Sequence, residues 1–345
     1  MCPGGGAVTA RRPGAFIAGV AGTALDAGER AFLADADPLG FILFARNVDS
    51  PDQLRRLTDT LRDAVGRDAP VLIDQEGGRV ARLRPPHWRD WPAPLEQVAT
   101  AGPHAEQVMR LRYAIIATEL RAAGIDVNCA PCADVARADT HAVLRNRCYG
   151  DTPGIVTRVA RAVAEGLLSG GVLPVLKHIP GHGAATADSH QELPRVDLPE
   201  PALQAVDFTP FAALSDLPMA MTAHVVYAAL DPDRPATTSP EVIALIRGQI
   251  GFGGLLMSDD ISMHALSGGI ADRCRAALSA GCDLVLHCNG DLAEMRLVAE
   301  TCGRMGPQAA QRAEAALALR NVPVPDRAAL IAEWDALKGA ATRDG

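Results

Sequence analysis

The sequence has little of several features that specialised proteins require. Aromatic residues make up 4% of the 345 residues, and Lys177 and Lys338 are the two lysines among 33 basic residues. No apolar run approaches the roughly 20 residues that span a bilayer, so we expect no membrane partner. Acidic residues outnumber basic ones, 41 to 33, and both signs are interleaved along the chain. Because a basic stripe is missing, we expect no nucleic-acid partner.

Cysteine is also scarce, with eight residues in the chain. They lack the density of a disulfide scaffold and the paired spacing of a zinc site, so we expect reduced thiols. One Cys-x-x-Cys pair, Cys129 and Cys132, ends an apolar run instead of opening a helix after a strand. This position favours core packing over redox chemistry.

The amino-terminal region contains Arg11-Arg12 followed by an apolar stretch, which imitates an export signal. Glycines interrupt that stretch, and charged residues follow at 26–30, where a cleavage site would be small and neutral. We therefore predict a cytoplasmic protein.

What the chain does contain is an alternation of short apolar runs with amphipathic stretches, in a composition that is 48% apolar. Eight runs are predicted strands: 15–20, 40–44, 70–74, 125–131, 172–178, 219–225, 254–259 and 283–289. Predicted helices include 26–36, 50–66, 104–124, 152–171, 239–251 and 269–281. The pattern predicts a single-domain (β/α)₈ TIM-type barrel over residues 1–345, with a last helix at about 326–340. An open doubly wound sheet is the alternative, weakened because no Gly-x-Gly-x-x-Gly follows the first strand.

Polar residues collect where the predicted strands end. In chain order they are Asp74, Lys177 with His178, His224, Asp259 with Asp260, and His287 with Asn289. The active sites of barrel enzymes lie at the carboxyl ends of the strands. A polar side chain at such a position is costly unless it is hydrogen-bonded or used. These residues are candidates for the site, although a satisfied polar cap remains an alternative for each.

The stretch LKHIPGHGAATADSH (176–190) combines Lys177 with three histidines. His178 and His182 have the i, i+4 spacing of a helical metal site, but Pro180-Gly181 between them forbids that helix. We therefore predict no metal and no cofactor. Asp188 and His190 are two residues apart, so both side chains can meet in an extended loop.

A carboxylate that accepts the Nδ1 proton of His190 would fix the tautomer of the ring and leave Nε2 to transfer a proton. Asp259, at the end of the seventh predicted strand, is the candidate nucleophile. One group that donates a proton and another that attacks from the opposite side are the arrangement of retaining glycosidases. The small residues between 181 and 187 predict a loop that moves during turnover.

With Lys-His-x-Pro-Gly-His-Gly-(x)₄-Asp-Ser-His and MSDDISM (257–263) in view, the chain resembles the β-N-acetylhexosaminidases of glycoside hydrolase family 3. The single-domain bacterial form that acts in peptidoglycan recycling is the most similar type. The motifs GFILFARNV (40–48), IDQEGGRVARL (73–83) and TAHVVY (222–227) extend the resemblance over most of the chain.

The resemblance implies a role for individual residues. Asp259 is the nucleophile, His190 the acid/base and Asp188 its partner, while Asp74, Arg82, Arg147, Lys177 and His178 bind the sugar. The segment Arg145-Asn146-Arg147 departs from the family pattern and leaves Arg145 as a second candidate for the arginine. The implied reaction is removal of terminal N-acetylglucosamine from peptidoglycan-derived fragments, so the expected partner is a carbohydrate.

Several alternatives stay open in the sequence. His190 as the acid/base would repel an anionic acceptor such as phosphate less than a carboxylic acid does. Phosphorolysis therefore stays open beside hydrolysis. Another family 3 glycosidase, a metal-dependent barrel hydrolase and an inactive sugar-binding barrel are further alternatives. Trp88 and Trp91 could line the mouth of the barrel, but packing within their loop is favoured. The oligomeric state, the aglycone and the roles of His182, His224 and His264 are left open.

Overall fold

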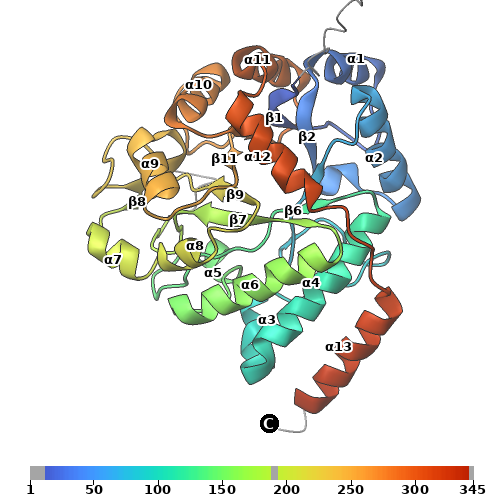
Figure 1. Ribbon diagram of the computed structural model, residues 1–345, viewed down its shortest axis with the longest axis vertical. Coiled ribbons are helices and arrows are strands. Elements are labelled where there is room, and N and C mark those ends of the chain that lie inside the picture. Colours follow the sequence, from blue (N-terminus) through green and yellow to red (C-terminus); the bar gives the residue numbers. More distant parts are fainter. Residues whose placement is uncertain (1–11, 188–192, 342–345) are drawn as a thin grey trace, which may run out of the picture.

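The computed structural model describes residues 12–187 and 193–341, and its centre is a closed barrel of eight parallel strands (Figure 1). Neighbouring barrel strands are also neighbours in chain order, and the last pairs with the first. The strands are β1 (Gly14–Gly19), β2 (Pro38–Leu43), β3 (Val71–Ile73), β6 (Val127–Asn128), β7 (Leu173–Ile179), β9 (Met219–Thr222), β11 (Leu255–Asp260) and β12 (Leu284–His287). The (β/α)₈ prediction is confirmed, and the open-sheet alternative is wrong.

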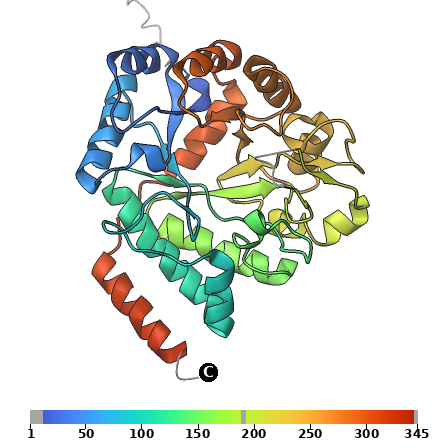
Figure 2. The same cartoon turned by 180° about the vertical axis from the view of Figure 1, so that it is seen from behind.

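Helices surround the barrel and cover the strands from outside, except for the last helix, which lies beyond this ring (Figures 1 and 2). They are α1 (Ala27–Ala36), α2 (Pro51–Val65), α3 (Pro94–Ala101), α4 (Ala105–Ala122), α6 (Pro153–Ser169), α7 (Glu200–Ala205), α8 (Thr209–Ala213), α9 (Pro240–Gly248), α10 (Ile270–Ala280), α11 (Leu292–Cys302), α12 (Pro307–Ala318) and α13 (Arg327–Ala341). Short elements lie in the connections: α5 (Ala142–Arg145), the 3₁₀ turns η1 (Ala45–Asn47), η2 (Gly102–His104) and η3 (Ala236–Thr238), and the strand pairs β4 (Gln75–Gly77) with β5 (Val80–Ala81) and β8 (Arg195–Val196) with β10 (Val226–Tyr227).

The helix limits follow from local signals in the sequence. Helix α2 begins after Ser50, whose hydroxyl accepts the N–H of Gln53, and Pro51 occupies its first turn. It ends at Gly66, which has a φ of 65°. Helix α1 begins with a capping box formed by Asp26 and Glu29. These signals explain why the predicted helix limits agree with the structure to within a few residues.

At the amino ends of β3 and β6, the buried carboxylate of Asp126 forms a hydrogen-bond network. Asp126 directly precedes β6, and its carboxylate accepts the N–H of Val71 at 2.7 Å and a hydrogen bond from Arg62 at 3.2 Å. Arg320 is a further partner. These contacts tie the strand ends to the outer helices at the end of the barrel opposite to the candidate site.

The carboxy-terminal helix α13 lies outside the ring, beside α3 and α4 in both views (Figures 1 and 2). Trp334 of this helix packs edge-on against Trp91, with 5.1 Å between the ring centroids. Trp88 and Trp91 are both buried. The packing role predicted for these two residues is confirmed, and the single large core of the barrel extends to α13.

Two further features agree with the sequence. The described cysteines are free thiols, and Cys129 and Cys132 are buried in the core, as expected from their position. Within the described ranges, no helix is both long and apolar enough to cross a membrane.

Candidate active site

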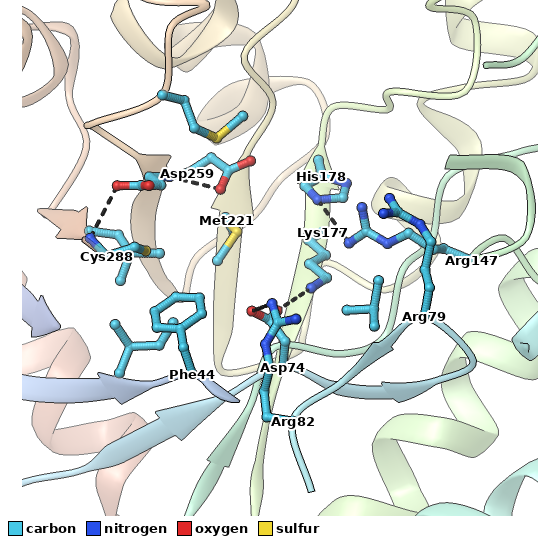
Figure 3. Close-up of a pocket in the computed structure, with 15 residues that line it drawn as sticks. Phe44, Asp74, Arg79, Arg82, Arg147, Lys177, His178, Met221, Asp259 and Cys288 are labelled. Atoms are coloured by element: carbon cyan, nitrogen blue, oxygen red, sulfur yellow. Dashed lines mark hydrogen bonds and ion pairs between the residues drawn. The ribbon is translucent and has the colours of Figure 1, made fainter. Parts of the chain in front are cut away.

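A cavity of about 270 Å³ lies at the carboxyl ends of the barrel strands (Figure 3). Its walls are formed by Ile42, Phe44, Asp74, Arg79, Val80, Arg82, Arg147, Lys177, His178, Met221, Asp259, Asp260, Met263, Leu286 and Cys288. All six predicted site residues that the structure describes are in this group. Asp188 and His190 lie outside the described residues, so their positions are not part of this geometry.

Asp74 follows β3 and holds two cations in the floor of the cavity. Its carboxylate accepts hydrogen bonds from Lys177 Nζ at 2.8 Å and from Arg82 Nη2 at 3.0 Å. Burial alone would raise the pKa of Asp74, but the charges of Lys177 and Arg82 outweigh it and lower this pKa well below its ordinary value. The site therefore presents an ionised carboxylate flanked by donors.

Glu76 is a buried member of the same network that the sequence analysis missed. It lies 2.7 Å from Lys177 Nζ and accepts two hydrogen bonds from Arg147, at 2.7 and 3.0 Å. Burial opposes its charge, yet Arg147 and Lys177 lower the pKa of Glu76 to about 2. Lys177 is 1% exposed, and although burial alone would lower its pKa, Asp74 and Glu76 raise it. The spacing Asp-x-Glu after a strand could have identified Glu76, because alternate strand residues share a face.

The ring of His178 is oriented by Asp134, a second residue that the sequence analysis missed. Its Nδ1 lies 2.7 Å from Asp134 Oδ2, and its Nε2 lies 3.5 Å from Arg147 Nη2 in the cavity wall. Asp134 is fully buried in the segment that follows β6. The available signal was the position of Asp134 just beyond a strand end. No sequence motif around Asp134 distinguished it from an ordinary buried residue.

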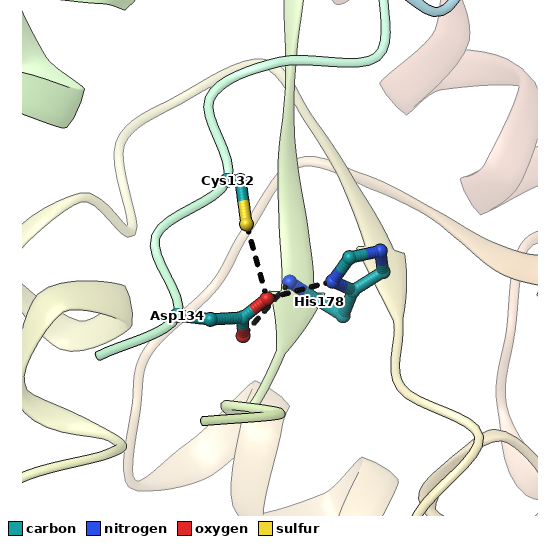
Figure 4. A group of neighbouring side chains, drawn as sticks. All are labelled: Cys132, Asp134 and His178. Atoms are coloured by element: carbon teal, nitrogen blue, oxygen red, sulfur yellow. Dashed lines mark hydrogen bonds and ion pairs between the residues drawn. The ribbon is translucent and has the colours of Figure 1, made fainter. Parts of the chain in front are cut away.

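Cys132, Asp134 and His178 have ligand atoms within 4.8 Å of one another and are the candidate metal group among the described residues (Figure 4). A metal would require the thiolate of Cys132 and a free carboxylate oxygen. The Cys148 thiol and burial raise the pKa of Cys132, and both oxygens of Asp134 already accept hydrogen bonds. These residues fit a hydrogen-bond network better than a metal site.

Asp259 lies on β11, which is separated from His178 on β7 by one strand, β9 with its Met221 (Figure 3). Its Oδ1 accepts the backbone N–H of Asp260 at 2.7 Å. Burial alone would raise the pKa of Asp259, but His224, His178 and the Asp260 N–H lower it. An ionised carboxylate at this strand end is suited to attack an electrophilic carbon or to stabilise positive charge.

Asp260 and His224 support the strand end that carries Asp259. Asp260 accepts hydrogen bonds from the Ser262 hydroxyl at 2.7 and 2.8 Å and from the Cys288 N–H at 3.1 Å. His224 is fully buried, and its Nε2 lies 3.0 Å from the Asp260 carbonyl oxygen. Because that oxygen can only accept, Nε2 of His224 carries the proton. The role of His224 is therefore to hold the backbone beside Asp259.

The remaining candidates of the sequence analysis lie away from the cavity wall. His287 pairs with Glu294 at 3.1 Å, and Asn289 donates to the same carboxylate at 2.6 Å. Arg145 donates to the carbonyl of Arg137. Arg147, and not Arg145, lines the cavity.

An apolar patch faces the charged floor of the cavity. Phe44 is the aromatic ring among the lining residues, and the guanidinium carbons of Arg46 and Arg82 lie 4.9 and 5.2 Å from its centroid. The cavity thus offers hydrogen-bonding groups on one wall and apolar contact on another, as small-molecule sites do.

Three comparisons with known proteins agree with this geometry. The family model described as "Glycosyl hydrolase family 3 N terminal domain" matches residues 18–316. A "Beta-hexosaminidase" of Alkalilimnicola ehrlichii is 40% identical over 284 residues, which cover 80% of this chain and 81% of that protein. Native NagZ from Neisseria gonorrhoeae has a TM-score of 0.83 and 31% identity, covering 95% of this chain and 97% of that one. The same protein has been solved with N-trifluoroacetyl-D-glucosamine, with a TM-score of 0.83, 30% identity, and coverage of 96% and 98%.

Proposed function

Because this chain belongs to glycoside hydrolase family 3 and is a β-N-acetylhexosaminidase, we propose that it removes terminal N-acetylglucosamine from peptidoglycan-derived fragments with retention of configuration. The observation that carries this proposal is one cavity lined by Asp259 and by the five predicted sugar-binding residues. Its volume of about 270 Å³ is at the lower end of small-molecule pockets, which favours one terminal sugar ring over an internal segment of a chain.

Asp259 is the nucleophile in the proposed mechanism. Its Oδ1 is held by the Asp260 N–H, so Oδ2 is the oxygen that attacks the anomeric carbon. His190, assisted by Asp188, donates a proton to the leaving oxygen as the glycosidic bond breaks. A water molecule then attacks the anomeric carbon while His190 accepts its proton, and the ester bond to Asp259 breaks, which restores the carboxylate. Two inversions at the same carbon give net retention.

The charged floor of the cavity is the proposed sugar clamp. Asp74, Lys177 and His178 present acceptors and donors to neighbouring hydroxyl groups, and Arg82 and Arg147 add planar donors. The N-trifluoroacetyl-D-glucosamine complex of the relative NagZ supports N-acetylglucosamine as the bound sugar. The cytoplasmic location inferred from the sequence belongs to the same proposal.

The proposed aglycone is an anhydro-N-acetylmuramic acid unit, which carries a carboxylate. Arg79 lines the cavity, where its guanidinium donates to the Val143 carbonyl at 3.1 Å, and its positive charge would favour such an anion over a neutral sugar. We expect the disaccharide with anhydromuramic acid to be cleaved with a higher kcat/KM than chitobiose. Equal values, or a preference for chitobiose, would contradict this part of the proposal.

The activity is tested by release of the chromophore from an aryl N-acetyl-β-glucosaminide and from an aryl β-glucoside. We expect release from the first, with water as acceptor and no change on addition of EDTA. If the sugar 1-phosphate formed in phosphate buffer, the reaction would be phosphorolysis and not hydrolysis. Loss of activity in EDTA that zinc restores would support the metal-dependent alternative.

The nucleophile is tested by Asp259→Asn. We expect kcat to fall by about 10⁴-fold or more, because the covalent route is removed. The matched control is Asp272→Asn, an exposed aspartate of α10, which should leave kcat unchanged. Full activity of Asp259→Asn would refute the assignment.

A further inference from the structure

The carboxylate of Asp134 accepts hydrogen bonds from four donors in three residues, and Figure 4 shows those from His178 and Cys132. Oδ1 accepts the backbone N–H groups of His178 at 3.3 Å and of His182 at 2.6 Å. Oδ2 accepts from His178 Nδ1 at 2.7 Å and from the Cys132 thiol at 3.2 Å. Within the described part of the chain, no lysine or arginine forms an ion pair with it. Asp134 is therefore a buried carboxylate used entirely as a hydrogen-bond acceptor.

These bonds hold both ends of the turn between His178 and His182. The same turn is packed against the segment that carries Asp134, because a side chain at Gly183 would run into the backbone carbonyl of Val135. Thr140 Oγ1 donates to the Gly183 carbonyl at 2.5 Å. The turn and the segment after β6 thus form one unit, and Asp134 is at its centre.

The bond to Asp134 also decides the proton position on His178. The carboxylate can only accept, so Nδ1 of His178 carries a proton. Arg147 can only donate, and its Nη2 lies 3.5 Å from His178 Nε2. The ring therefore presents an unprotonated Nε2 to the cavity, which makes it an acceptor for a hydroxyl proton.

We propose that Asp134 is a positioning residue that holds His178 in the Nδ1–H tautomer and fixes its ring against the cavity. The expected effect of Asp134 on turnover rests on the proposed function, in which His178 binds the sugar. The expected tautomer of His178 does not depend on that function. Asp134 does not line the cavity, so it acts through His178.

The direct test is the ¹⁵N NMR spectrum of the histidine rings, with His178 assigned by the signals lost in His178→Gln. In the wild type we expect Nδ1 of His178 to be protonated and Nε2 to be bare. In Asp134→Asn, the amide oxygen satisfies the two backbone N–H groups, which leaves its NH₂ facing Nδ1. We then expect the proton to move to Nε2. A wild-type His178 protonated on Nε2 alone would overturn the proposal without any variant at Asp134.

The kinetic test uses the same variant on the aryl N-acetyl-β-glucosaminide. We expect kcat/KM to fall about ten- to hundredfold, mostly through KM, the fold-change that corresponds to one charge-assisted hydrogen bond. In a His178→Ala background, Asp134→Asn should have little further effect on KM, because the ring through which it acts is absent. Equal effects of Asp134→Asn with and without His178 would contradict the proposal.

The control is Asp126→Asn, a buried carboxylate at the amino end of the same strand, β6. It should lower the stability but leave KM and the His178 spectrum unchanged, since it is remote from the cavity. If the wild type released no sugar, the proposed function would fail while the NMR measurement still decided the tautomer.

Discussion

Glu76 lies behind the cavity wall, between two cations that line the cavity. It pairs with Lys177 and accepts both hydrogen bonds of a bidentate contact with Arg147. Bidentate carboxylate–guanidinium pairs hold a fixed geometry, so Glu76 sets the direction of Arg147. Removal of its charge would leave two buried cations side by side.

We predict that Glu76→Gln lowers the free energy of unfolding by about 3–5 kcal/mol, the cost of breaking a buried ion pair. Urea unfolding measures this change. The control is Glu106→Gln, an exposed residue paired with Arg158, which should change the stability by less than about 1 kcal/mol. A similar effect of both substitutions would show that the Glu76 network does not stabilise the fold.

The candidate residues could be predicted where a strand end and a motif coincide. Asp74, Lys177, His178 and Asp259 fulfil both conditions and do line the cavity. Glu76 and Asp134 could not be selected in the same way. The Asp-x-Glu spacing was a local signal for Glu76, but the partners that give the two carboxylates their importance lie far away in the sequence, Arg147 for the first and His178 for the second.

At the scale of elements, the strands of the barrel follow from apolar runs, and the helices from their caps. Strand β6 is the exception, because it extends only over Val127–Asn128 although the apolar run covers 125–131. Pro131 has no N–H to offer a ladder, and the Ala130 N–H bonds to Asn128 within a turn. Residues 130–133 still run alongside β7, because Ala130 and Pro131 accept the N–H groups of Val175 and Lys177, and this path places Asp134 beside His178.

Helix α13 is a separate case, since it lies outside the ring of helices that the barrel pattern requires. Its Trp334 is 3% exposed and packs on Trp91. Arg327 near its start bonds to the buried Glu119 of α4 at 2.6 Å. The helix is therefore attached by the Trp334–Trp91 contact, by partly buried apolar side chains packed against the core, and by ion pairs of Arg327 with Glu119 and of Glu333 with Arg110.

We predict that Trp334→Ala lowers the free energy of unfolding by no more than about 3–5 kcal/mol. Amide exchange should become faster throughout α13, while kcat/KM should be unchanged. Hydrogen exchange followed by mass spectrometry measures the effect on each helix. Val324→Ala, an exposed position before α13, should leave exchange in the helix unchanged. Protection of α13 in the tryptophan variant equal to that of the wild type would contradict this account of its attachment.

For the whole molecule, buried titratable groups predict how stability depends on pH. Burial and the neighbouring His178 lower the pKa of His182 from 6.5 to about 4. Between these values the unfolded chain binds a proton that the folded chain refuses, so stability falls as pH decreases. The pKa of Glu76 is lowered from 4.5 to about 2. Its contribution to the free energy of unfolding is therefore lost only as the pH falls below 4.5.

We predict that the free energy of unfolding decreases between pH 6.5 and 4 by up to about 1.4 kcal/mol per pH unit from His182. His182→Gln should flatten this part of the curve, while the exposed His87→Gln should not. Burial also lowers the pKa of His224, so some slope should remain. Urea unfolding at four pH values in this range measures the slopes, and parallel curves for wild type and His182→Gln would refute the assignment.

The ion pairs of Lys177 and Arg147 exist before any ligand arrives. A long basic side chain loses about 2 kcal/mol of rotamer freedom when it is immobilised. Here that entropy is lost when the chain folds, because Asp74 and Glu76 already hold both side chains. A ligand that enters the cavity meets donors that need no further ordering. The free energy of binding is therefore reduced only by the entropy that the ligand itself loses and by the cost of displacing water.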